Sequence, residues 1–105
     1  MFNIIARRTI NEYAESYPDA KSALQRWYYE LEEADFKNFN ELKKVFLNAS
    51  LVSDGRVVFN IGGNKYRLVV RINFQFKGIQ IKWFGTHPEY DKINVETVTF
   101  KKKKS

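Results

Sequence analysis

Residues 56–84, RVVFNIGGNKYRLVVRINFQFKGIQIKWF, decide the fold because apolar and polar side chains alternate along them. Alternation with a period of two is typical of β-strands that have one buried face. Two breaks in the pattern, at Gly62–Asn64 and Phe76–Gly78, have the composition of hairpin turns. The pattern therefore predicts an antiparallel meander of three strands.

The alternation also divides the side chains of these strands between two faces of the sheet. The face expected to pack on the core carries Val57, Phe59, Ile61, Tyr66, Leu68, Val70, Ile72, Phe74, Ile79, Ile81 and Trp83. The opposite face carries Arg56, Val58, Asn60, Lys65, Arg67, Val69, Arg71, Asn73, Gln80, Lys82 and Phe84. One face of an antiparallel sheet is commonly solvated, so the second set is expected to form a basic, exposed surface.

The first half of the chain has the spacing of helices. Residues 2–5 have strand character, and apolar residues then recur every three or four positions in 7–16, 19–33 and 40–46. Asn40 is expected to cap the last of these helices. The combination predicts an α+β domain, in which an N-terminal strand and two to three helices pack on one face of an antiparallel sheet.

Length and charge limit the class of protein further. A chain of 105 residues can form one modest core, so we assign residues 1–100 to a single domain and 101–105 to a basic tail. Of the net charge of +6, residues 1–54 carry −2 (7 basic, 9 acidic) and residues 55–105 carry +8 (11 basic, 3 acidic). A positive field confined to one half of the chain favours a polyanionic partner.

Several kinds of chemistry are excluded by composition. The chain has no cysteine, so it can form no disulfide, thiolate nucleophile or iron–sulfur cluster. One histidine and scattered carboxylates give no metal-ligand spacing, and we expect no metal and no cofactor. Gly62–Gly63 lacks the lysine that completes a phosphate loop. No segment has the length of a membrane span or the order of a signal peptide, which predicts a cytoplasmic protein with no membrane partner.

The middle strand carries a row of cations. Lys65, Arg67 and Arg71 are spaced by two and four residues and so point the same way, and no Asp or Glu occurs between Gly55 and Pro88. Such a face can hold phosphates, which arginine braces with two hydrogen bonds. It can also simply keep a sheet soluble. The predicted RNA-binding set on this face comprises Lys65, Arg71, Lys82, Arg56 and Phe84, whose ring is placed to stack on a base.

A second candidate site is the segment GTHPEYD at residues 85–91. It contains His87, the only histidine of the chain, close to Tyr90 and Asp91. Histidine exchanges a proton near neutral pH, and loops at strand ends often carry function. The alternatives are an inert surface histidine and an Asp91 that only caps the following turn.

The two segments VFNIGGNKYRLVVRINF (58–74) and IKWFGTHPEYDKI (81–93) together resemble the HigB toxins of the RelE superfamily, and the resemblance extends over nearly the whole chain. It implies a small α+β fold and a toxin that enters the ribosomal A site and cuts messenger RNA. It also implies contacts with ribosomal RNA, and a HigA-like helix-turn-helix antitoxin that binds the toxin.

The resemblance implies a metal-free reaction in which the ribose 2′-hydroxyl attacks the adjacent phosphate, leaving a cyclic phosphate and a 5′-hydroxyl. The catalytic residues that it implies are Arg67, which stabilises charge on the phosphate, His87 as general acid or base, and Tyr90 and Asp91 beside it. Lys65 would position the RNA backbone.

Two other interpretations of the sequence stay open. A non-catalytic RNA-binding module would explain the charge equally well, but would tolerate the loss of His87. A protein-interaction module would use the same basic surface to meet an acidic partner. A toxin also needs a protein partner, so a neighbouring gene for a helix-turn-helix protein favours the toxin.

Overall fold

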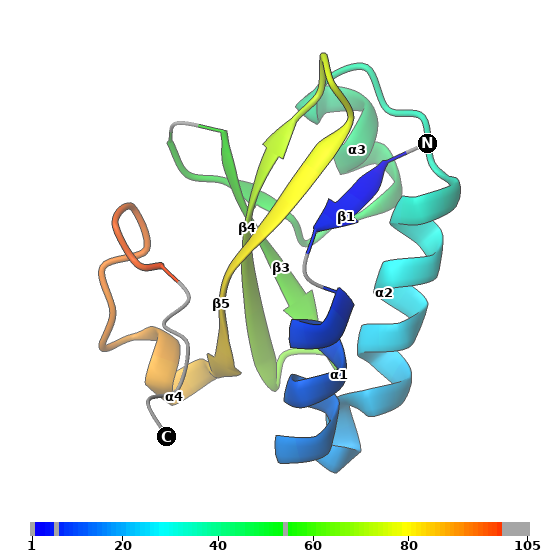
Figure 1. Ribbon diagram of the computed structural model, residues 1–105. Helices are drawn as coiled ribbons and strands as arrows, with labels where there is room; N and C mark the ends of the chain where they lie inside the picture. Colours follow the sequence, from blue (N-terminus) through cyan, green and yellow to red (C-terminus); the bar gives the residue numbers. More distant parts are fainter. Residues whose placement is uncertain (1, 6, 54, 100–105) are drawn as a thin grey trace.

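The computed structural model describes residues 2–5, 7–53 and 55–99 and shows an α+β fold (Figure 1). This fold class is the one predicted. In chain order the elements are β1 (Asn3–Ile5), α1 (Arg7–Ser16), a 3-10 turn η1 (Pro18–Ala20), α2 (Lys21–Glu33), α3 (Phe39–Val45), β2 (Ser50–Leu51), β3 (Arg56–Ile61), β4 (Tyr66–Asn73), β5 (Gly78–Thr86) and α4 (His87–Tyr90).

The five strands form one sheet in the order β1-β5-β4-β3-β2. Strands β3, β4 and β5 are the antiparallel meander that the alternation predicts. The short strand β2 pairs antiparallel with β3 at one edge. At the other edge β1 runs parallel to β5, with Ile4 opposite Ile79, so the N-terminus is part of the sheet.

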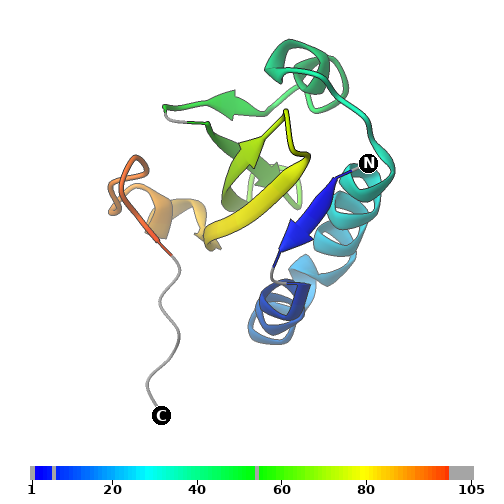
Figure 2. The same cartoon turned by 45° about the horizontal axis from the view of Figure 1, so that its top comes forward.

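Helices α1 and α2 lie on one side of the sheet, whereas α4 and the C-terminal segment lie on the other (Figure 2). The core lies between the sheet and the first group of helices. Its helical side comes from Ile10, Ala14, Ala20, Leu24, Trp27, Leu31 and Leu42, and its sheet side from Val57, Phe59, Ile61, Tyr66, Leu68, Val70, Ile72, Ile79, Ile81 and Phe84. Burial of these side chains is the main stabilising contribution to the fold.

The start of α3 differs from the prediction. Asn38, not Asn40, is the cap, and its side chain accepts a hydrogen bond from the backbone N–H of Glu41 at 3.0 Å. The Glu41 carboxylate in turn accepts from the N–H of Lys37 at 2.8 Å. These two bonds satisfy backbone donors at the helix start, which explains why the helix begins at Phe39.

A β-bulge in β5 overturns the predicted orientation of its second half. Val69 of β4 is opposite Trp83 and Val70 is opposite Ile81, so Lys82 has no partner and the alternation shifts by one residue. Phe84, predicted on the basic face, is therefore a core residue that is 6% exposed. Trp83, predicted in the core, is half-buried on the opposite face, beside Val69.

Phe84 is held in the core by other rings. It stacks on Tyr13, with centroids 4.9 Å apart, and on Tyr66, with centroids 5.3 Å apart. Tyr17 meets it edge to face at 5.4 Å. The prediction that Phe84 stacks on an RNA base is therefore wrong, because its ring is enclosed by aromatic neighbours.

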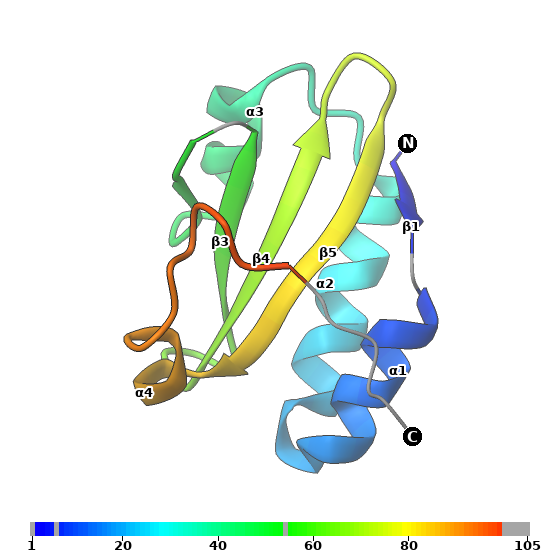
Figure 3. The same ribbon diagram turned by 60° about the vertical axis from the view of Figure 1, so that its left-hand side comes forward.

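The second face of the sheet is also less exposed than predicted. Residues 92–99 cross it over β3 and β4 (Figure 3), and Val58, Val69 and Arg56 are buried, the last at 8% exposed. Arg56 Nη1 donates to the carbonyls of Val95 at 3.1 Å and Val98 at 2.5 Å. The prediction of Arg56 on an exposed RNA-binding surface is therefore wrong, because its guanidinium anchors the C-terminal segment.

Candidate active site

The candidate site forms where the end of β5 and the first turn of α4 meet the start of β4. Thr86 caps α4 by accepting from the N–H of Glu89 at 3.3 Å, and Glu89 accepts from the N–H of Thr86 at 2.8 Å. This reciprocal capping fixes the direction in which the short helix leaves the sheet. Proline at position 88 suits the first turn, since its missing N–H has no intrahelical role there.

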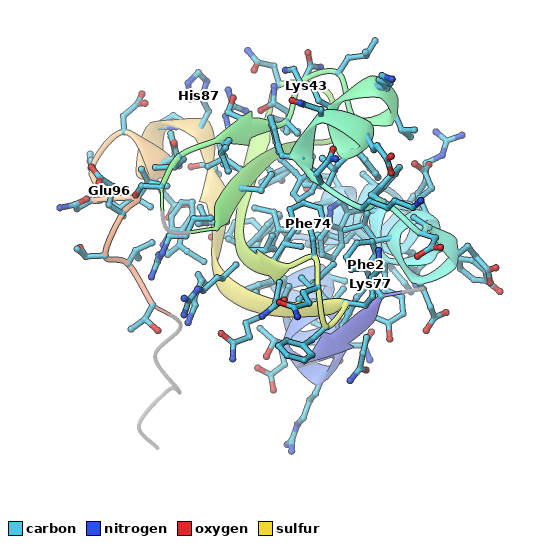
Figure 4. The ribbon with its side chains drawn as sticks, turned by 90° about the horizontal axis from the view of Figure 1, so that it is seen from above. Phe2, Lys43, Phe74, Lys77, His87 and Glu96 are labelled. Carbon is cyan, nitrogen blue, oxygen red and sulfur yellow. The ribbon has the colours of Figure 1, made fainter. Side chains whose placement is uncertain are left out.

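A single backbone hydrogen bond joins the two predicted site regions. The N–H of His87 donates to the carbonyl of Lys65 at 3.0 Å. This bond places the backbone of His87 next to Lys65, directly before β4, the strand that carries Arg67. The imidazole itself projects from the periphery of the molecule (Figure 4), with the side chain 43% exposed.

Arg67 is held by its own hairpin. Its Nη1 donates to the carbonyls of Asn64 at 3.2 Å and Tyr66 at 3.1 Å, and Nη2 donates to Oδ1 of Asn64 at 2.8 Å. These partners are neutral, and among the described residues no carboxylate binds this guanidinium. Its charge is therefore pre-oriented and uncompensated by a contact, which suits it to bind an anion.

Lys65 has a different environment, which the sequence did not reveal. Its Nζ forms an ion pair with Asp19 of η1 at 2.5 Å, and the hydroxyl of Tyr66 donates to the same carboxylate. Hydrogen bonds from Lys65 and then Tyr66 hold the pKa of Asp19 below its usual value, and Asp19 raises the pKa of Lys65. Lys65 therefore has a counter-ion from the helical layer, although the strands themselves carry no acidic residue.

The helical layer also reaches α4. The Tyr17 hydroxyl donates to Oε1 of Glu89 at 3.2 Å. The pKa of Glu89 is lowered, chiefly because the backbone N–H of Thr86 donates to its carboxylate. Tyr17 and Asp19, at the corner between α1 and α2, thus brace both elements that carry the site.

His87 and Asp91 lie on the same side of α4, one turn apart. Their closest atoms, Nε2 and Oδ1, are 3.8 Å apart, which is too long for a hydrogen bond but short enough for an ion pair when the imidazole is protonated. Tyr90 lies between them in sequence, and its ring centroid is 6.2 Å from that of Trp83. The predicted residues Arg67, His87, Tyr90 and Asp91 thus belong to adjoining elements.

The remaining predicted RNA-binding residues lie farther along the sheet. Arg71 is exposed on β4 opposite Gln80, and Lys82 is the half-buried residue at the bulge. Arg71 and Gln80 line an open groove of about 590 Å³ at the end of the sheet that is distant from α4. The groove is lined by Gly55, Arg71, Ile72, Asn73, Phe74, Gly78 and Gln80.

The described part of the chain has neither a cluster of metal-ligating side chains nor a membrane-spanning helix. No group of three or more His, Cys, Asp or Glu side chains comes together there as metal ligands would. In residues 2–5, 7–53 and 55–99, no helix has the length and apolar character needed to cross a membrane.

Comparison with known protein families identifies the class to which this chain belongs. Residues 20–93 match the model of the HigB toxin family, described as the RelE-like toxic component of a toxin–antitoxin system. The match covers more than half of the chain, so the protein belongs to this family. The resemblance inferred from the sequence motifs is thereby confirmed, and an antitoxin is the partner that membership entails.

Individual relatives agree with the family assignment. The chain is 32% identical over 93 residues, 87% of its length, to an mRNA interferase HigB of Escherichia coli O6:H1 strain CFT073, of which 90% is covered. It is 33% identical over 91 residues to the mRNA interferase toxin HigB of Escherichia coli K12, covering 85% of this chain and 88% of the relative. A HigB of Shigella flexneri matches equally well.

Proposed function

We propose that this toxin is a ribosome-dependent endoribonuclease that cleaves messenger RNA without a metal ion and so inhibits translation. The observation that carries the proposal is the hydrogen bond from the His87 N–H to the Lys65 carbonyl, which joins the short helix of the histidine to the start of the strand that carries the braced cation Arg67. The names of the relatives, which are mRNA interferases, support the same activity.

The proposed reaction is attack of a ribose 2′-oxygen on the adjacent phosphorus. The bond from phosphorus to the 5′-oxygen breaks, which leaves a 2′,3′-cyclic phosphate and a 5′-hydroxyl. The proton of the 2′-hydroxyl goes to a base, and the leaving 5′-oxygen takes a proton from an acid. No oxidant, reductant or second substrate is needed.

The residues are assigned roles by their environments. Arg67 stabilises negative charge on the phosphate, because its guanidinium is already oriented and has no carboxylate partner among the described residues. His87 is the proton-exchanging group, and Asp91, whose carboxylate lies 3.8 Å from the imidazole, orients it. Tyr90 contacts the RNA next to the reacting phosphate. Lys65 adds positive charge but is already paired with Asp19.

The proposed partners follow from the same function. The ribosomal A site supplies the messenger RNA, and the exposed Arg71 and the half-buried Lys82 contact ribosomal RNA or the flanking RNA backbone. The antitoxin is a HigA-like helix-turn-helix protein that silences the toxin and represses the shared operon.

The test is induced expression of the wild type, Arg67→Ala and His87→Ala in a bacterial host, with growth and the 5′ ends of messenger RNA as readouts. Arg26→Ala is the matched control, because this exposed arginine of α2 pairs with Glu30 and lies outside the site. We expect arrest and new in-frame cuts with the wild type and the control only.

The variants must accumulate as folded protein for this comparison, which circular dichroism checks. A soluble wild type that leaves growth and transcripts unchanged would refute the nuclease. If the wild type and His87→Ala arrest growth equally, the protein is a toxin, but His87 has no part in its mechanism.

A further inference from the structure

The β-bulge in β5 gives Trp83 a position that neither the sequence pattern nor the family assignment explains. Its strand neighbour Phe84 belongs to the core, whereas Trp83 stands on the face of the sheet that carries Arg67 and Val69. A half-buried indole thus lies beside the candidate active site. An accessible aromatic face next to a cation is a common arrangement for binding unpaired bases.

The place of the ring is fixed by Gly85. A Cβ atom added at this glycine would lie 2.6 Å from Cη2 and 2.7 Å from Cζ2 of Trp83, so the six-membered ring occupies the space that any other residue would fill. In the pairing of β4 with β5, Gly85 is opposite Arg67. The indole therefore lies over the strand position next to the braced guanidinium.

Tyr90 forms a second wall beside the indole. The two rings are 6.2 Å apart and inclined by 51°, so they are not stacked on each other. Tyr13, Tyr17 and Tyr66, the other rings near this end of the sheet, pack around Phe84 in the interior. Trp83 and Tyr90 are thus the two rings among the described residues that the site itself presents.

We propose that Trp83 is a base-binding residue, on which a nucleobase of single-stranded RNA stacks while its phosphate lies toward Arg67 and His87. This inference rests on the proposed ribonuclease function and adds a ligand subsite to it. Stacking requires only the π-face that every base has, so the subsite holds one nucleotide in place for cleavage without itself reading a unique base.

The experiment measures binding of short RNA that cannot be cut, in the absence of ribosomes. The probe is a labelled 2′-O-methyl tetranucleotide, which lacks the attacking hydroxyl, and its partner is an abasic analogue with the same phosphates. Affinity is read from the anisotropy of the label at low salt. Tryptophan fluorescence is followed in parallel, because Trp27, the other tryptophan, is buried at 3% exposed and acts as an internal reference.

We expect the base-containing oligonucleotide to quench Trp83 and to bind about 5- to 150-fold more tightly than the abasic one. Trp83→Leu should remove this difference, whereas Trp83→Phe, which keeps an aromatic face, should retain most of it. Tyr29→Leu is the matched control, because Tyr29 is a 67% exposed aromatic residue on α2, and it should behave as wild type.

Three results would overturn the proposal. These are equal binding of the two oligonucleotides to the wild type, unchanged discrimination by folded Trp83→Leu, and no measurable binding of the base-containing probe up to about 1 mM. The nuclease is tested separately by transcript cleavage on ribosomes. If the wild type binds the base-containing oligonucleotide more tightly but cuts no transcript, the base-binding site is supported and the nuclease is refuted. If it cuts transcripts but binds both oligonucleotides equally, the nuclease is supported and the base-binding site is refuted.

Discussion

The bulge at Lys82 can be tested by measuring how substitutions of two neighbouring residues change the free energy of unfolding. Phe84 is 6% exposed and contacts three tyrosine rings, so Phe84→Ala should lower the free energy of unfolding by about 3–5 kcal/mol. Trp83 is half-buried on the other face, and Trp83→Ala should lower it by less than about 2 kcal/mol.

The assay is urea unfolding of purified protein made by cell-free synthesis, followed by circular dichroism. With an m-value of about 2 kcal/mol per molar, the loss at Phe84 shifts the midpoint by roughly 1.5–2.5 M. Phe84→Leu should lose less, since the leucine keeps most of the buried volume. If Trp83→Ala proved more damaging than Phe84→Ala, the alternation would continue unbroken through β5, and the reasoning about the bulge would be refuted.

Three further outcomes are expected. Gly85→Ala should displace the ring of Trp83, because the new Cβ would lie within 2.7 Å of it; tryptophan emission should shift, and unchanged emission would argue against the close approach. Asp19 has a lowered pKa in the folded state, so its stabilising contribution is fully present above pH about 4 and is lost as the pH falls through the folded pKa; Asp19→Asn should therefore flatten the acid limb of a plot of urea midpoint against pH, and an unaltered limb would contradict the ion pair. Arg56→Ala should release residues 92–99 from the sheet, because two carbonyls lose their donor; limited proteolysis should cut there faster than in wild type, and equal rates would show that other contacts hold the segment.

Much of the fold could be predicted because the decisive segments have unbroken periodicity. In β4 the alternation continues without interruption, and the predicted core residues Tyr66, Leu68, Val70 and Ile72 are all buried. In α2 the spacing of Leu24, Trp27 and Leu31 likewise identifies the buried face. A period persists only where each residue advances the strand or helix by a constant step.

The predictions from the sequence were wrong where the periodicity is interrupted or where segments far apart in the sequence come together. The unpaired Lys82 is an ordinary residue for a strand, so the sequence has no signal for the bulge that exchanges Trp83 and Phe84. Asp19 reaches Lys65 across 46 positions of sequence, a contact that only tertiary packing creates. Arg56 is covered by an irregular C-terminal segment whose composition has no period.

The candidate site, like the fold, could be predicted from the sequence only in part. His87 and Arg67 could be singled out by residue type and position, and their elements adjoin in the fold through the backbone of Lys65. The catalytic roles of His87 and Arg67 are proposed from the chemistry of their side chains. The alternation does not single out Trp83, because an apolar ring in an alternating strand is usually a core residue.

The bulge also has a consequence for how this protein tolerates genetic change. Substitutions at Lys82 alter one side chain, but removal of its codon would restore a continuous ladder between β4 and β5. Trp83 would stay opposite Val69 and Phe84 opposite Leu68, so both rings would keep their present faces of the sheet. A deletion at this position would therefore shorten β5 without moving any other side chain of the strand to the opposite face of the sheet.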